Sequence, residues 1–262
     1  MNVLTDLFDE YADRFQKIPM LPLLYCGHFM MVTLGLRKRI GATFAQTNPL
    51  ACWFSTVVAN FSGLILINSL LGKPLILLFE DPNKILVITV IWYFAFFFPK
   101  NFFTRFFISE PLWVVIIILK EAHRTRGILD GVYLGMKLYP DSMVIVVILG
   151  FLKGAAGLLA DPIAAAIRGS SSFANNEALK PSFVTKISVF ISIIFTCSLK
   201  GMILTNIPIS HLCLGSFIIL ASTRVLLYLS GWRDPFVPFE NAVSPVCFGC
   251  PSESHDTKSK KD

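Results

Sequence analysis

The sequence predicts an all-α polytopic membrane protein with seven transmembrane helices, and three observations support that prediction. The chain is 54% hydrophobic and only 15% charged, whereas soluble domains carry about 25% charged residues. Its mean hydropathy is +0.65. Apolar runs recur along most of the chain, as they do in membrane proteins built from helices. The segments between these runs are too short for a large soluble domain.

Residues 1–17 are expected to form a short amphipathic helix. Its apolar residues recur at helical spacing: Leu4, Leu7, Phe8, Tyr11 and Phe15. Acidic residues fill the opposite side of this helix. A helix of this kind either lies on the membrane surface or caps the helix bundle.

Seven apolar segments follow, and each is expected to form one membrane-spanning helix. They are Ile18–Leu36, Pro49–Leu71, Ile85–Phe98, Leu112–Gly135, Met143–Leu159, Val184–Leu199 and Leu212–Leu229. An odd number of spans places the two termini on opposite sides of the membrane. Lys and Arg are more numerous in the segments that become cytoplasmic if the N-terminus is outside. The positive-inside rule therefore predicts a lumenal or extracellular N-terminus and a cytoplasmic C-terminus.

The spans also repeat in threes, which predicts an internal duplication. A constant shift along the chain places Pro49 on Pro140 and Gly63 on Gly154, and the third and sixth spans are both short. Because each unit has three spans, the second copy begins on the opposite side of the membrane from the first. The two repeats are therefore inverted relative to each other. The expected units are residues 18–98 and 99–199, followed by the seventh span in 200–230 and a cytoplasmic tail in 231–262.

The fourth apolar segment contains the charged stretch Lys120–Arg126. If Leu112–Gly135 forms one helix, these charges lie near the middle of the membrane, where each costs at least about 2.5–3.5 kcal/mol unless it is solvated or paired. The alternative ends the span at Leu119 and makes the charges a solvated loop. However, Leu112–Leu119 would reach only about 12 Å as a helix, which is too short to cross. We therefore expect the helix to continue and a binding site to lie beside it.

Charge and spacing indicate what this site binds. Lys120 and Arg124 are one helical turn apart, with Gly127 and Gly131 on the same stripe, so the bases could grip a phosphate group beside a groove. Glu121 can pair with Arg124. Two further residues one turn apart, Arg126 and Asp130, could neutralise each other on another face of the helix. Bases outnumber the acid, which favours an anionic ligand.

Glycines in the second and fifth spans are candidate pore or hinge residues. Gly150, Gly154 and Gly157 share one face of the fifth span beside Lys153, and Gly63 occupies the matching span of the first repeat. Membrane helices of transporters and channels are often bent or broken at such positions. The alternative is a small-residue packing face, with Lys153 reaching toward the membrane surface.

The stretch Lys120-Glu121-Ala122-His123-Arg124-Thr125-Arg126 resembles the Lys-Glu-Val-x-Arg phosphoinositide-binding motif of the trimeric intracellular cation (TRIC) channels. Other similar segments are Ala51-Cys52-Trp53, Leu71–Ile76, Lys153-Gly154, Pro235-Phe236 and Pro245–Gly249, so the likeness covers about Ile18 to Gly249. The chain departs from the motif in three places: Ala122 replaces Val, Arg126 replaces Lys, and Gly127 stands where another base is usual. The chain resembles a B-type animal member.

The resemblance implies a homotrimer in the endoplasmic or sarcoplasmic reticulum membrane, with one pore in each protomer. It implies passage of potassium and sodium, which balances charge during calcium release. It also implies that phosphatidylinositol 4,5-bisphosphate binds near the pore, with Lys120, Glu121, Arg124 and Arg126 as candidate headgroup-binding residues. The same basic residues would also suit a lipid carrier or scramblase that binds phosphoinositides, and this is the alternative function.

No enzyme or metal site is expected. The sequence shows no paired carboxylates, metal-spaced histidines or nucleophile elbow. The segment Cys247-Phe248-Gly249-Cys250 is a lone CxxC without a second pair, and this is a weak zinc signal. The candidate sites are therefore those for the lipid headgroup and the pore.

Overall fold

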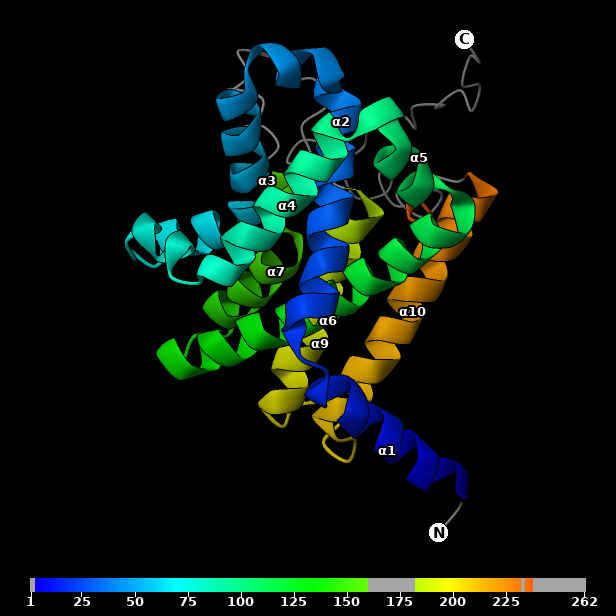
Figure 1. The fold of residues 1–262 in the computed structure, drawn as a ribbon. Coiled ribbons are helices and arrows are strands. Elements are labelled where there is room, and N and C mark those ends of the chain that lie inside the picture. The colour runs from blue at the N-terminus through cyan, green and yellow to red at the C-terminus, as the bar shows by residue number, and fades with distance from the viewer. Residues whose placement is uncertain (1–2, 160–181, 232–233, 238–262) are drawn as a thin grey trace, which may run out of the picture.

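The computed structural model describes residues 3–159, 182–231 and 234–237, which fold into helices and turns without a strand (Figure 1). The helices are α1 (Val3–Lys17), α2 (Tyr25–Thr47), α3 (Pro49–Leu70), α4 (Pro82–Phe97), α5 (Phe102–Ile108), α6 (Glu110–Leu138), α7 (Met143–Leu159), α9 (Phe183–Leu199) and α10 (Ile209–Ser230). A short π-helix, η1 (Met20–Leu24), precedes α2, and two short 3₁₀-helices, η2 (Leu75–Phe79) and η3 (Pro99–Asn101), precede α4 and α5. The all-α prediction is confirmed.

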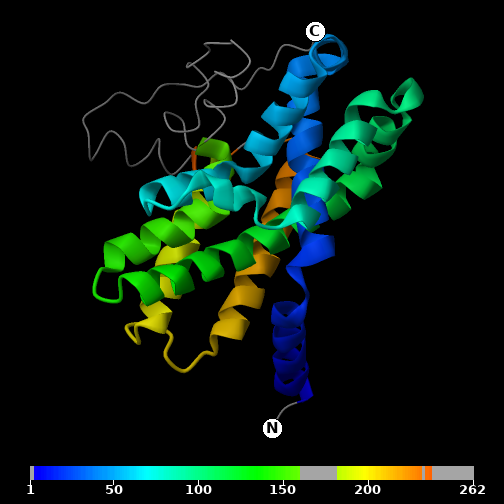
Figure 2. The same cartoon turned by 60° about the vertical axis from the view of Figure 1, so that its left-hand side comes forward.

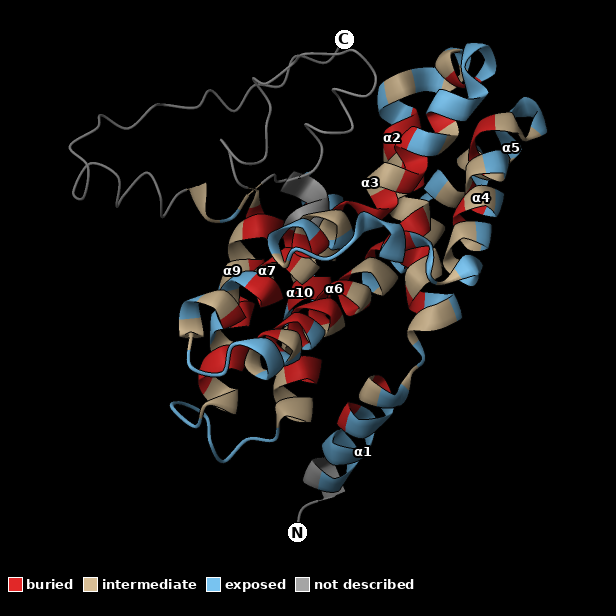
Figure 3. Ribbon diagram, turned by 90° about the vertical axis from the view of Figure 1, so that its left-hand side faces the viewer, coloured by how far each residue is buried: buried red, intermediate tan, exposed pale blue. Residues whose placement is uncertain are grey.

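Helix α6 is the centre of the bundle. It contacts α2, α7, α9 and α10, and buried residues gather where these helices meet (Figure 3). The side chains of Ile128 and Val132 are fully buried there. The helix runs without interruption from Glu110 to Leu138, straight through the charged stretch. The prediction of a continuous helix is confirmed, and the alternative of a solvated loop is excluded.

Helices α6 and α7 run side by side (Figure 2) and touch through glycines. A Cβ atom added to Gly131 would lie 2.5 Å from the carbonyl oxygen of Leu149, and one added to Gly135 would lie 2.7 Å from the Cα of Val146. On α7, a Cβ on Gly150 or Gly154 would collide with side chains of neighbouring helices. These four glycines therefore form a close-packing face, as in membrane helix pairs generally.

This packing corrects one expectation about the phosphate groove. The groove was expected to extend along Gly127 and Gly131, but the backbone of α7 covers Gly131. Glycine has no Cβ atom, so a neighbouring helix can pack its backbone directly against a stripe of glycines. Helix α7 itself is one helix from Met143 to Leu159, which contains Gly157.

The first long helix extends beyond the end of its apolar run. The run ends at Leu36, but α2 continues to Thr47 with a break at Gly41, whose φ is +74°. Arg37, one of the bases counted in the segments expected to be cytoplasmic, is buried at 8% exposure. Its guanidinium donates to Thr104 Oγ1 at 2.7 Å and to Asn101 Oδ1 at 2.5 Å. Because these acceptors replace water, the charge is tolerated inside the fold.

The acceptors of Arg37 belong to a sharp bend that the sequence pattern did not predict. Helix α4 and the segment Pro99–Ile108 meet at an angle of 96°. Lys100 and Asn101 at the corner both have positive φ, of 55° and 57°. Helix α5 begins just after the corner, and Arg37 holds this corner against α2.

The N-terminal helix α1 packs against α10. The rings of Phe15 and Phe217 stack with centroids 4.8 Å apart, and Ala12 is fully buried. At the other end of the contact, His211 Nε2 lies 2.5 Å from Asp9 Oδ1. The helix therefore contacts the bundle, which is the second of the two placements expected for it.

The long apolar helices agree with a multi-pass membrane protein. By length and mean hydropathy, the segments Met20–Thr47, Pro49–Leu70 and Ile209–Ser230 could each cross a membrane, and the bent pair Pro82–Phe97 with Pro99–Ile108 would make a fourth if counted as one span. Two shorter apolar helices, Met143–Ala155 and Phe183–Leu199, and the charged α6 lie among them. The count of seven spans and the inverted repeat stay predictions.

We expect Gly131→Ala to destabilise the fold, because the added methyl group would push α7 away from α6. Overpacking of this kind typically costs about 1–3 kcal/mol. Gly215→Ala on α10 is the matched control, since no atom lies within 4 Å of its added Cβ. Thermal unfolding in detergent should show a lower midpoint for the first variant only. Equal midpoints would show that α6 and α7 are not closely packed.

Candidate functional site

A cavity of about 570 Å³ lies beside α6, between α2, α3, α7 and α10. Its volume is in the range of about 300–1,000 Å³ that is typical of small-molecule sites. The basic residues that line it come from five helices: Arg39, Lys84, Lys120, Arg124, Lys153 and Arg224. Among the described residues that line it, only Asp130 is acidic. The cavity is therefore strongly positive.

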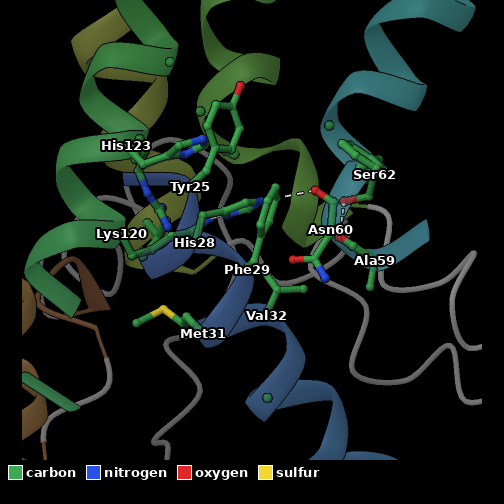
Figure 4. A pocket seen from close by; sticks show the side chains of 18 of the residues that line it. Tyr25, His28, Phe29, Met31, Val32, Ala59, Asn60, Ser62, Lys120 and His123 are labelled. Carbon is green, nitrogen blue, oxygen red and sulfur yellow. Dashed lines mark hydrogen bonds between the residues drawn. The ribbon is translucent and has the colours of Figure 1, made fainter. Parts of the chain in front are cut away.

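Lys120 is held against one wall by His28 (Figure 4). The Lys120 ammonium is in hydrogen-bond contact with His28 Nδ1. On its other side, His28 Nε2 lies 3.2 Å from the backbone carbonyl oxygen of Asn60. The rings of His28 and His123 stack with centroids 4.6 Å apart and an interplanar angle of 5°. Helices α2, α3 and α6 are thus joined at this wall by polar contacts.

Arg124 is fixed by a buried carboxylate. Its Nε lies 3.1 Å from Glu121 Oε2, and Arg224 Nε on α10 lies 3.4 Å from Glu121 Oε1. Glu121 is completely buried, and a buried charge is tolerated only with such partners. The predicted pairing of Glu121 with Arg124 is confirmed. One carboxylate between two guanidinium groups leaves the cluster with a net positive charge.

Arg126 and Asp130, which helical spacing would allow to pair, each bind another partner. Asp130 Oδ2 lies 3.8 Å from Lys153 Nζ on α7, and Arg126 donates to the backbone carbonyl oxygen of Ile18. Ile18 follows the end of α1, where carbonyl groups have no partner within the helix. Tertiary partners have therefore replaced a pairing that helical spacing alone allowed.

Part of the predicted site lies in the cavity and part does not. Five of the predicted residues line it: Gly63, Lys120, Arg124, Lys153 and Gly154. Glu121 and Arg126 bind other protein groups outside the lining, and Gly150 packs between helices. Gly157 belongs to α7, but it lies outside the residues whose side-chain environment the structure describes. The headgroup and pore roles of these residues stay predictions.

Sequence reasoning missed several ionisable residues of the site, among them His28, Lys84 and Arg224. His28 and Arg224 each stand inside an apolar run, and Lys84 precedes one. A lone ionisable residue within a membrane span is itself a signal of function, because burying it is costly. That signal could have identified His28 and Arg224. Nothing in the sequence indicated that Lys84 would reach the same cavity.

Comparison with known proteins decides the family. The family model described as TRIC channel matches residues 38–231, which is most of the chain. The chain belongs to the TRIC channel family. A trimeric intracellular cation channel type A from Xenopus tropicalis is 31% identical over 261 residues, which cover 98% of this chain and 87% of that protein. The type 1B.1 channel from Caenorhabditis elegans is 29% identical over 241 residues, covering 90% and 81%.

Solved TRIC structures share the fold. A TRIC counter-ion channel, studied for its activity in calcium release, superposes with a TM-score of 0.80 at 27% identity, covering 85% of this chain and 99% of that one. A TRIC channel from C. elegans in the absence of Ca²⁺ also gives 0.80 at 28% identity, covering 86% and 97%. The chain is therefore a multi-pass membrane protein of a channel family, which agrees with the expectation that it is not an enzyme.

We expect Glu121→Gln to destabilise this TRIC protein strongly. The change leaves the guanidinium groups of Arg124 and Arg224 facing each other without a carboxylate, and breaking a buried ion pair costs about 3–5 kcal/mol. The matched control is Glu10→Gln, which breaks the exposed pair of Glu10 with Arg14. An exposed pair contributes about 0–1 kcal/mol. Thermal unfolding in detergent should separate the two variants, and similar midpoints would contradict the role of Glu121.

Proposed function

We propose that this TRIC protein conducts potassium and sodium across the endoplasmic or sarcoplasmic reticulum membrane as counter-ions during calcium release. Two findings support the proposal. Its relatives carry the name of intracellular cation channels, and a structure of the same fold is that of a counter-ion channel in calcium release. The observation that carries most weight is the positively charged cavity inside the helix bundle, lined by residues from both halves of the chain.

The positive charge of the cavity requires a partner before cations can pass nearby. Lys120, Arg124 and Lys153 surround the same space, and cations would be repelled from it at low dielectric. We propose that phosphatidylinositol 4,5-bisphosphate supplies the neutralising charge, with its headgroup phosphates held by these three bases. Glu121 then acts by holding Arg124, and Arg126 by holding the end of α1. The lipid is a ligand of the channel in this proposal.

The assembly is a homotrimer with one pore in each protomer. The helices that line the cavity all belong to one chain, which supports a separate pathway in each protomer. The names of the relatives include the word trimeric. Trimerisation then serves to place the exposed apolar faces of neighbouring protomers together, and each protomer keeps its own pathway.

An inverted repeat accounts for the order of the helices. Helices α2, α3 and α4 form the first unit and α6, α7 and α9 the second, with α10 appended. The third helix of each unit is short, with 16 residues in α4 and 17 in α9. Gly63 on α3 and Gly154 on α7 hold matching places in the two units, and both line the cavity. This symmetry favours the cavity as the pathway and these glycines as its narrow or hinged points.

Steady potassium currents in planar bilayers that contain the phosphoinositide would test the function. We expect Lys120→Ala and Arg124→Ala to lower both channel opening and lipid affinity, because each removes a charge-assisted contact of about 1.5–3 kcal/mol. That loss corresponds to roughly tenfold or more in Kd. Lys137→Ala, on the exposed end of the same helix, should change neither quantity.

Two results would contradict parts of this proposal. Unchanged lipid affinity in both cavity variants would show that the headgroup does not bind at this site. Transfer of phosphoinositide between leaflets without steady current would favour a lipid carrier or scramblase over a channel.

The proposed topology places the N-terminus in the lumen and the C-terminus in the cytosol. On a cysteine-free background, we expect Lys38→Cys to react with a membrane-impermeant maleimide in intact microsomes, and Glu80→Cys to react only after permeabilisation. Both side chains are exposed in the fold. Glu80 is used because the neighbouring Asp81 caps α4 by accepting a hydrogen bond from the Asn83 amide. The opposite labelling pattern would reverse the orientation.

A further inference from the structure

The segment that follows α10 folds back onto α9. Helix α10 ends at Gly231, whose φ of +72° is the left-handed conformation typical of a helix C-terminus. Further along the chain, Asp234 Oδ1 accepts a hydrogen bond from the Phe236 amide at 2.9 Å, and Oδ2 accepts one from Lys186 Nζ on α9 at 2.7 Å. The Lys186 and Asp234 side chains are only 15% and 13% exposed. This ion pair is therefore better shielded from water than a surface pair, and it joins the segment to α9.

The ring of Phe236 contacts the same face of α9. It stacks on Phe183 with centroids 5.7 Å apart and on Phe190 with centroids 6.0 Å apart. The Lys186 ammonium lies 6.0 Å from the centroid of the Phe236 ring, which is the outer limit of a cation–π contact. Phe183, Lys186 and Phe190 are three and four residues apart, so they form one stripe of the helix. Asp234 and Phe236, which we call the C-terminal clasp, thus bind a single face of α9.

The C-terminal clasp lies beside the wall of the cavity. Phe236 packs on a small buried cluster formed by Phe183, Val184 and Leu227. Val184 on α9 and Leu227 on α10 also line the cavity. The clasp therefore packs on the cluster at which α9 and α10 meet, directly behind two residues of the cavity wall.

The same part of α10 carries one of the cavity bases. Arg224 lies about one helical turn before Leu227, and both residues line the cavity. Arg224 Nε is 3.4 Å from Glu121 Oε1, a longer contact than the 3.1 Å between Arg124 Nε and Glu121 Oε2. Because 3.4 Å is already long for such a contact, a small outward movement of α10 would break it. The position of α10 against α9 therefore decides whether Arg224 stays with Glu121.

We propose that the C-terminal clasp positions Arg224 at the cavity by holding the end of α10 against α9. While the clasp is docked, Val184 and Leu227 remain in one cluster and the wall between the two helices is closed. When the clasp is released, the end of α10 moves outward and Arg224 leaves Glu121. The cavity then loses one of the bases that hold an anionic headgroup. The effect on lipid affinity rests on the proposed function.

Cysteine labelling tests the closure of the wall without any ligand. On a cysteine-free background, Val184→Cys should react slowly with a membrane-impermeant maleimide, because Val184 is only 5% exposed. Adding Phe236→Ala, which removes the stacked ring, should raise this rate several-fold. Ala155→Cys on α7 is the matched control, since Ala155 is 1% exposed and also lines the cavity but lies outside the cluster. Its rate should not change.

Two labelling results would overturn the proposal. Equal rates for Val184→Cys with and without Phe236→Ala would show that the clasp does not close this wall. A matching rise at Ala155→Cys would show that the substitution loosens the whole bundle and not the contact between α9 and α10.

The affinity for phosphatidylinositol 4,5-bisphosphate in lipid nanodiscs tests the role of Arg224. We expect Asp234→Asn and Lys186→Met each to lower this affinity by roughly two- to fivefold, the range expected for loss of one partly exposed ion pair. The double variant should lose no more than either single variant, because both changes break the same contact. Glu10→Gln, which breaks an exposed pair on α1, is the control and should leave the affinity unchanged.

A second background shows whether the clasp acts through Arg224. Arg224→Gln removes the charge but keeps an amide that can donate to Glu121. If the clasp works by positioning Arg224, adding Asp234→Asn to this background should not lower the affinity further. A further loss would show that the clasp acts by another route and would overturn the proposal.

The outcomes also separate this proposal from the proposed lipid site. Wild-type affinity in Asp234→Asn, together with weakened binding in Lys120→Ala, would overturn the clasp proposal and leave the lipid site in place. If neither variant changes the affinity but Phe236→Ala exposes Val184→Cys, the lipid assignment fails. The clasp then stands as the element that closes the wall between α9 and α10.

Discussion

The fold depends on keeping the charges of α6 paired inside an apolar bundle. Glu121 is completely buried and lies between Arg124 on its own helix and Arg224 on α10. A carboxylate without these partners would be too costly at that depth, and the same holds for the two guanidinium groups. The ion cluster therefore ties α10 to α6. It also fixes Arg124 at the wall of the cavity, where its remaining positive charge acts on whatever enters.

Close packing decides where the cavity can lie. Glycines on α6 and α7 bring the two backbones together and close the space between them. The open volume is left beside this contact, between α6 and the helices α2, α3, α7 and α10. Because α7 approaches so closely, Lys153 reaches Asp130 and still lines the cavity. The glycines thus shape the site by setting how closely α7 approaches the central helix.

The charge balance of the cavity links its structure to its proposed activity. Six bases and one acid line a space of about 570 Å³ among the described residues, which is an unusual setting for the passage of cations. An anionic lipid headgroup would reverse that balance, and small changes in the position of Lys120 would alter it further. His28 joins Lys120 to the backbone of α3 through two hydrogen-bond contacts.

The sequence by itself determined the helical class, the continuity of α6 through Lys120–Arg126 and the pairing of Glu121 with Arg124. These follow from hydrophobic length and from spacing within one helix, which are local properties. Only the tertiary structure decided that Arg126 binds the Ile18 carbonyl and that Asp130 turns to Lys153. It also brought His28, Lys84 and Arg224 to the same cavity. These contacts join residues far apart in the chain, and their partners are selected by which helices pack together, which spacing along one helix does not encode.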